Sequence, residues 1–83
     1  MLSNRVGKFS LSKAFIKDSP DVCMQIMGKV IVLRAEYMWN DTVEYVAISN
    51  EFRELKEGET PPYYKACVYY RDSKLTIKFE ERK

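Results

Sequence analysis

The sequence predicts an α+β domain: a four- to five-stranded, mostly antiparallel sheet made of two hairpins plus an N-terminal strand, with one or two short helices. Two stretches of alternating apolar and polar residues, each interrupted by a short turn, predict the hairpins. Short apolar segments that end at a glycine predict the helices. The chain has 83 residues, of which 46% are hydrophobic. This is enough apolar surface to fold and enough length for one domain, so we predict a single domain over residues 1–83.

The N-terminal part of the chain contains a predicted strand, followed by a segment that fits either a helix or a strand. Phe9 and Leu11 share one side of residues 5–16, which predicts the extra strand. Farther along, Pro20 follows a serine and a glycine closes the segment, as at the two ends of a short helix. The apolar residues of 20–27 also alternate as in a strand, so the sequence leaves both structures open here.

Residues 29–49 predict the first hairpin. They are rich in β-branched and aromatic residues, and Asn40-Asp41 interrupts them with turn chemistry. A two-residue turn there pairs Trp39 with Thr42, which sets the register of the whole hairpin. This register aligns Leu33 with Ile48, Ala35 with Val46 and Tyr37 with Glu44. Both faces are partly apolar, so we expect a helix, the N-terminal segment or another chain to cover the second face.

Residues 50–58 predict a short helix between the hairpins. Asn50 is a typical N-cap and Gly58 a typical stop signal. Phe52 and Leu55 are spaced three residues apart, which places them on one side of a helix. We expect these two side chains to anchor the helix to the sheet.

Residues 63–83 predict the second hairpin through two independent signals that agree. Asp72-Ser73 is suitable for a two-residue loop, which sets Arg71 opposite Lys74. In that register one face of the hairpin is apolar throughout, and a slip by one residue would expose it. The pairs on this face are Tyr70 with Leu75, Val68 with Ile77 and Ala66 with Phe79, and Tyr64 points to the same side.

The chain lacks the residues that most catalytic and metal sites need. It has no histidine, the commonest general base and a common zinc ligand. Ser12 and Lys13 have no partner motif for nucleophilic chemistry, and three scattered glycines cannot form a phosphate-binding loop. We therefore predict no catalytic residue, no metal site and no cofactor, so the protein is not an enzyme.

Two features bear on the location of the protein. Cys23 and Cys67 are far apart in a chain without a secretory signal, which predicts two reduced thiols. The longest purely apolar run covers residues 30–33, far fewer than the roughly 20 residues that cross a bilayer. We expect a cytoplasmic protein with no membrane partner.

An aromatic and basic surface is the main functional candidate. The side of the second hairpin opposite its apolar face displays Tyr63, Lys65, Tyr69, Arg71 and Lys78. We predict that these residues bind a protein partner, through the sheet face or a strand edge. A homodimer is one such partnership, since a chain this small buries a small core. The alternative is a single-stranded nucleic-acid-binding domain that uses the same face, and a third interpretation gives the rings only a packing role.

The segment 39–64, WNDTVEYVAISNEFRELKEGETPPYY, resembles small uncharacterised proteins of phage and prophage genomes. In those proteins an aromatic strand is followed by a phenylalanine, an acidic loop with a glycine, and a Pro-x-Tyr return. The resemblance covers under a third of the chain and assigns no role to any residue. It implies a non-enzymatic protein that binds and modulates a host or phage component, including inhibition of a defence or replication system.

Overall fold

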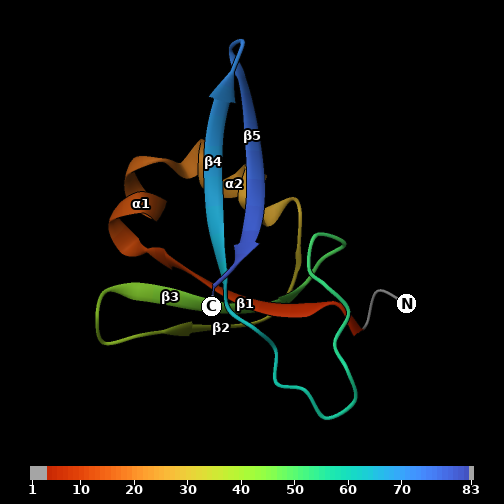
Figure 1. Cartoon of the computed structure of the whole chain (residues 1–83). Coiled ribbons are helices and arrows are strands. Elements are labelled where there is room, and N and C mark those ends of the chain that lie inside the picture. The colour runs from red at the N-terminus through yellow and green to blue at the C-terminus, as the bar shows by residue number, and fades with distance from the viewer. Residues whose placement is uncertain (1–3, 83) are drawn as a thin grey trace.

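The structure, a computed structural model, describes residues 4–82 and confirms the predicted α+β class (Figure 1). Its strands form two antiparallel sheets instead of one: a three-stranded sheet in the order β1-β3-β2, and the hairpin β4-β5. Within residues 4–82, no helix has the length and apolar character that crossing a membrane requires. The elements in chain order are β1 (Val6–Ser12), α1 (Lys13–Asp18), α2 (Pro20–Met27), β2 (Ile31–Tyr37), β3 (Thr42–Ile48), β4 (Tyr64–Arg71) and β5 (Lys74–Glu81).

The predicted N-terminal strand ends earlier than expected. β1 pairs antiparallel with β3 and buries Phe9 and Leu11, as their alternation predicts. Ser12 then caps the helix α1, which sequence analysis missed: its hydroxyl accepts a hydrogen bond from the amide of Phe15 at 3.0 Å. The prediction of a strand over residues 13–16 is therefore wrong, because the serine cap starts a helix at that point.

The ambiguous segment is the helix α2. Pro20 is its first residue, and at its end the amide of Gly28 donates a hydrogen bond to the carbonyl of Met24 at 2.9 Å. Cys23 and Ile26 are both buried in the core, whereas Met24 between them is exposed. A strand would bury alternate residues, so this spacing of three explains why the helix is the better fit.

The register predicted for the β2-β3 hairpin is wrong. Tyr37 pairs with Val43, and the amide of Met38 donates to the carbonyl of Thr42 at 2.8 Å, so the loop has three residues instead of two. The last loop residue, Asp41, has a φ of 61°, the left-handed conformation typical of such loops. A β-bulge in β2 then shifts the register a second time. The other observed pairs are Ile31 with Ile48, Val32 with Ala47, Arg34 with Val46, Ala35 with Tyr45 and Glu36 with Glu44.

The segment between β3 and β4 forms turns and not the predicted helix. Phe52 is completely buried, as an anchor should be, but Leu55 is only half-buried. The amide of Arg53 donates to the Tyr64 hydroxyl at 3.0 Å, and the amide of Leu55 donates to the carbonyl of Asn4 at 2.8 Å. These amides bond to distant residues instead of to carbonyls one turn back, and this replaces the helical hydrogen-bond pattern.

The register predicted for the β4-β5 hairpin is confirmed, beginning with Arg71 opposite Lys74. Asp72 and Ser73 have positive φ angles of 50° and 65°, as in a type I′ turn. The tip of this hairpin projects beyond the helices and the three-stranded sheet (Figure 1). Tyr70 lies near the tip and is 72% exposed, so its predicted place in the core is wrong. The core covers this side of the hairpin only nearer the base, where Tyr64, Ile77 and Phe79 are buried.

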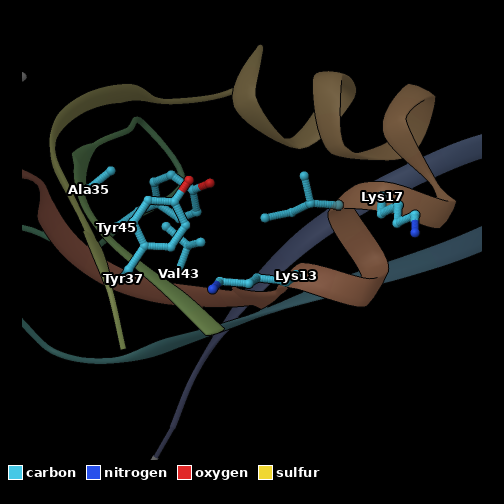
Figure 2. Close-up of a pocket in the computed structure, with 7 residues that line it drawn as sticks. Lys13, Lys17, Ala35, Tyr37, Val43 and Tyr45 are labelled. Atoms are coloured by element: carbon cyan, nitrogen blue, oxygen red, sulfur yellow. The ribbon is translucent and has the colours of Figure 1, made fainter. Parts of the chain in front are cut away.

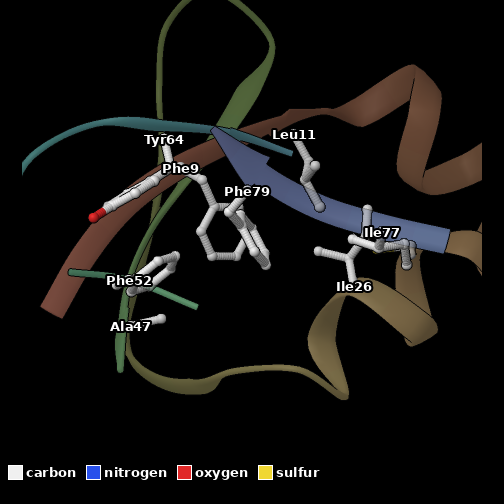
Figure 3. Packing of buried hydrophobic residues seen from close by; sticks show 9 residues of the cluster. Phe9, Leu11, Ile26, Ala47, Phe52, Tyr64, Ile77 and Phe79 are labelled. Atoms are coloured by element: carbon white, nitrogen blue, oxygen red, sulfur yellow. The ribbon is translucent and has the colours of Figure 1, made fainter. Parts of the chain in front are cut away.

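An aromatic cluster in the core joins the two sheets (Figure 3). The ring of Phe79 in β5 lies 5.2 Å, centre to centre, from Phe9 in β1 and 5.2 Å from Phe52. Phe52 in turn stacks on Tyr64, with ring centres 4.4 Å apart. Tilted and offset ring pairs stabilise the core beyond the area that they bury. The base of the β4-β5 hairpin is thus held in the core while its tip extends into solvent.

Candidate functional site

The five residues predicted as a binding surface lie on the outer side of the β4-β5 hairpin or at its base. Lys65, Tyr69 and Arg71 occupy positions of β4 that point to one side, and Lys78 lies on the same side of β5. Tyr63 comes directly before β4. All five are exposed. Four of them share one side of the hairpin and Tyr63 lies at its base, and we call these five residues the outer face.

Tyr63 is held at the base of the hairpin through β1. The amide of Lys8 donates to the carbonyl of Pro62 at 2.9 Å, and Lys8 and Tyr63 form a parallel bridge. The Lys8 ammonium lies 5.8 Å from the centre of the Tyr63 ring, within the range of a cation–π contact. Tyr63 therefore has a fixed position while part of its ring remains accessible.

A thiol and a carboxylate lie in the middle of the outer face. The thiol of Cys67 donates a hydrogen bond to Oε2 of Glu80 at 3.2 Å. Burial, followed by this hydrogen bond, raises the pKa of Cys67, and the hydrogen bond with Cys67 raises the pKa of Tyr69. Both groups are therefore protonated at neutral pH, and a protonated thiol is a poor nucleophile and a poor metal ligand.

An open groove of about 500 Å³ lies at the tip of the hairpin. It is lined by Val68, Tyr69, Tyr70, Arg71, Thr76 and Lys78. Two tyrosine rings and two cations are therefore accessible from the same space. Sequence analysis missed Tyr70 as a surface residue, since alternation assigns a residue to a face but does not show whether another element covers that face.

A second groove, of about 620 Å³, lies between α1 and the β2-β3 hairpin (Figure 2). Lys13 and Lys17 line it from the helix, and Tyr37 lines it from the strands. The Lys13 ammonium lies 4.8 Å from the centre of the Tyr37 ring and 3.9 Å from the Asp41 carboxylate. Sequence analysis missed this groove because it did not predict α1, for which the N-cap serine was the available signal.

Arg53 connects the loop before β4 to the end of β5. Its guanidinium donates to the two carboxylate oxygens of Glu59 at 2.9 and 2.6 Å, and to Glu81 at 2.8 Å. Glu59 also accepts a hydrogen bond from the amide of Lys56 at 2.9 Å. The bonds from Arg53, and then the one from Lys56, lower the pKa of Glu59 to about 2. The charges of Arg53, Glu59 and Glu81 thus have their partners within the chain, and the cluster has the structural role of joining the loop before β4 to β5.

The residues considered for catalysis have structural partners. The Ser12 hydroxyl caps α1, and Lys13 contacts Tyr37 and Asp41. In the part of the chain that the structure describes, no group of three or more Cys, Asp or Glu side chains is placed to hold a metal ion.

Comparison of the chain with family models, with curated proteins and with solved structures finds no match in any of the three. The resemblance of residues 39–64 to phage and prophage proteins therefore stays a prediction. The outer face combines tyrosine rings that can stack, cations that can pair with acids, and the Glu80 carboxylate, which can accept hydrogen bonds.

Proposed function

We propose that this chain is a small non-catalytic binding protein whose outer face docks against an acidic surface of another protein. The main support is the hairpin tip, where Tyr69 and Tyr70 line an open groove together with Arg71 and Lys78. Tyrosine and arginine are enriched at the energetic centres of protein interfaces. They bury a large area there while their polar ends still form hydrogen bonds.

The charge at the tip of the hairpin favours an acidic partner. Residues 68–78 contain three cations, Arg71, Lys74 and Lys78, and one acid, Asp72, which gives a net charge of 3 − 1 = +2. Glu80 and Glu81 lie toward the base, so the whole hairpin over residues 64–81 has a net charge of 4 − 3 = +1. Complementary charge speeds association and disfavours partners with the wrong sign. Because the base of the hairpin is fixed in the aromatic core, its strands lose little conformational freedom on binding.

Single-stranded nucleic acid is the competing partner, since exposed rings and cations can also bind bases and phosphates. The position of Glu80 argues against it. Its carboxylate is hydrogen-bonded to Cys67 and places a negative charge on the outer face beside the rings and cations. A protein can place a hydrogen-bond donor against this carboxylate, whereas a polyanion would be repelled.

We further propose that the partner is a host or phage component that binding modulates or inhibits, as the resemblance of residues 39–64 implies. A cytoplasmic location is consistent with the two cysteines, Cys23 and Cys67, which are free thiols. The outer face would then act by occupying a surface of its target.

The test compares the double variant Tyr69→Ala/Arg71→Glu with the control Lys56→Glu. The control makes the same charge change as Arg71→Glu, at an exposed position of the loop before β4. The partner captured from the native cell is purified, and its Kd for each variant is measured by isothermal titration calorimetry. We expect the Kd to weaken about tenfold or more for Y69A/R71E and by less than about twofold for K56E.

Two outcomes would contradict the proposal. The first is a Y69A/R71E variant that circular dichroism shows to be folded and that keeps the wild-type Kd. The second is capture of nuclease-sensitive material whose affinity falls steeply with salt, which would assign the outer face to nucleic acid.

A further inference from the structure

β2 is an open edge of the three-stranded sheet. Among the described residues it pairs with one neighbour, β3, and all seven of its residues are exposed. Ile31 and Leu33 are more than half exposed, Tyr37 is 76% exposed, and Trp39 just beyond the strand is 95% exposed. The opposite edge of the sheet is partly covered, because Tyr63 bridges to β1. An uncovered strand edge with apolar side chains is a template for pairing with another strand.

The hydrogen bond from Met38 to Thr42 shows which way the backbone of β2 is oriented. In an antiparallel pair, alternate residues direct their N–H and C=O groups toward the neighbouring strand. Met38 faces β3 in this way, so Glu36 and Arg34 do as well. Ala35, between them, directs its backbone groups away from the sheet, where they are available to a second strand.

Two charged side chains of β2, Arg34 and Glu36, have no salt-bridge partner within residues 4–82. Glu36 pairs directly with Glu44 of β3, so like charges lie opposite each other. A cation placed opposite Glu36 on the open side of β2 would offset this repulsion.

A second copy of β2 supplies this cation in one register. If two β2 strands pair antiparallel about a two-fold axis at Ala35, each Arg34 lies opposite Glu36 of the partner subunit. An axis at Arg34 or at Glu36 would instead put like charges opposite each other. An axis at Leu33 or at Tyr37 would put both charges opposite uncharged residues.

The backbone favours the same register. An axis at Ala35 lets the two alanines exchange hydrogen bonds through their outward groups. Arg34 and Glu36 then occupy the non-hydrogen-bonded positions, where opposing Cα atoms are about 4.5 Å apart and side chains lie closest. Charge complementarity and backbone orientation therefore agree on a single arrangement.

We propose that the protein forms a homodimer in which β2 pairs with β2 of a second copy, with three strands from each chain in one continuous sheet. Leu33 lies opposite Tyr37 of the partner subunit at each end of the contact. Leu33 is the residue that the bulge leaves without a partner in β3, so the regular part of the contact covers residues 34–36, and Leu33 and Trp39 lie at its borders. Since the β1 edge is partly covered, assembly stops at two copies instead of growing into a fibre.

Charge reversals test this register, with sedimentation equilibrium of the full chain as the measurement. Glu36→Arg and Arg34→Glu should each weaken the dimer Kd by about tenfold, because each puts like charges opposite each other at two symmetric places. The double variant R34E/E36R restores opposite charges and should return the Kd to within about twofold of wild type. Glu57→Arg makes the same charge change as E36R in an exposed loop and should leave the Kd unchanged.

The Tm of each single variant shows whether a weaker dimer results from unfolding of the chain or from loss of the contact between folded chains. E36R replaces the repulsion with Glu44 by attraction, so its Tm at low concentration should not fall. A wild-type chain that remains monomeric at the highest concentration that stays in solution would overturn the proposal. So would a dimer that the single reversals do not weaken, or that R34E/E36R does not restore. The outer-face variant Y69A/R71E should dimerise like wild type, so failure of one proposal is visible separately from failure of the other.

Discussion

Replacing Gly7 by alanine should destabilise the fold, because β1 has no space for a side chain at this position. A Cβ at Gly7 would lie 2.6 and 2.7 Å from Cε2 and Cδ2 of Tyr64 and 2.9 Å from Cδ2 of Phe52. Carbon atoms in contact prefer about 3.5–4.0 Å, so the new methyl group would overlap both rings. Neither ring can shift freely, since Tyr64 accepts a hydrogen bond from the amide of Arg53 and Phe52 packs edge-on against Phe79.

The expected loss for Gly7→Ala is about 1–3 kcal/mol, the usual cost of overpacking a core. A chain of 83 residues has a total stability of about 4–12 kcal/mol, so the substitution removes a sizeable part of it. Gly28→Ala is the matched control. Its Cβ would lie 3.5 Å from the carbonyl oxygens of Gln25 and Met24, and its φ of −68° suits alanine. This control should raise the stability by about 0.4–1 kcal/mol.

Urea denaturation followed by circular dichroism measures both free energies of unfolding. A G7A variant as stable as wild type would refute the packing argument, as would a G28A variant that loses as much stability as G7A. A third measurement isolates the cause. In a Phe52→Leu background the cost of Gly7→Ala should shrink, because the smaller side chain leaves room for the methyl group. An equal cost in both backgrounds would show that the overlap with Phe52 is not responsible.

Two further substitutions test the turn at the hairpin tip and the arginine cluster. Ser73→Gly should raise the free energy of unfolding by roughly 0.5–1 kcal/mol, which a higher urea midpoint would show, because glycine adopts a φ of 65° without the steric cost that serine has. An unchanged or lower midpoint would contradict the left-handed turn. Arg53→Met should make stability less sensitive to acid. The pKa of Glu59 is lowered from 4.5 to about 2 in the folded chain, so its contribution is complete above pH 4.5 and is lost as pH falls toward 2. Urea midpoints across this pH range should therefore fall less for R53M than for wild type, and parallel curves for the two chains would argue against the cluster.

The two hairpins show when a register can be predicted from sequence. In β4-β5, Asp72-Ser73 fits a type I′ turn and the apolar alternation independently requires the same pairing. In β2-β3, Asn40-Asp41 suggests a similar turn, but Asp41 is the third residue of a longer loop. A residue that tolerates a left-handed backbone suits loops of either length, so composition alone does not choose between them. The bulge in β2 adds a shift that no local signal marks.

Local signals alone did not decide the helices. For residues 20–27, Pro20 and Gly28 mark the ends of a helix while the apolar alternation also fits a strand, and only the burial of Cys23 and Ile26 in the fold identifies the helix α2. Residues 50–58 have comparable local signals, yet the amides of Arg53 and Leu55 bond to Tyr64 and Asn4, which are distant in sequence. Such tertiary hydrogen bonds outweigh a weak helix propensity and leave no trace in the segment itself.

For the candidate surfaces too, local patterns predicted some features, and others depend on the whole fold. Strand alternation alone placed the outer-face residues of β4 and β5 on one side of the hairpin. The exposure of Tyr70 and of β2 was not predictable, because it depends on which strands become neighbours and where each sheet ends. Alternation assigns side chains to faces, whereas coverage of a face or an edge is a property of the whole fold.

The proposed dimer and the outer face use different sheets, and this separation bears on how the protein would bind. The contact between Phe9 of β1 and Phe79 of β5 fixes the β4-β5 hairpin relative to the three-stranded sheet. A dimer formed through β2 would therefore hold two outer faces in a fixed relation about one axis. Once the first face is bound, the second binds at the high effective concentration that this geometry sets, provided that the target presents two sites. A symmetric or repeating target would thus gain avidity from the dimer, whereas a single-copy target would bind each face independently. An exposed edge strand in so small a domain would in this way raise its affinity for an assembled target without a larger interface on either chain.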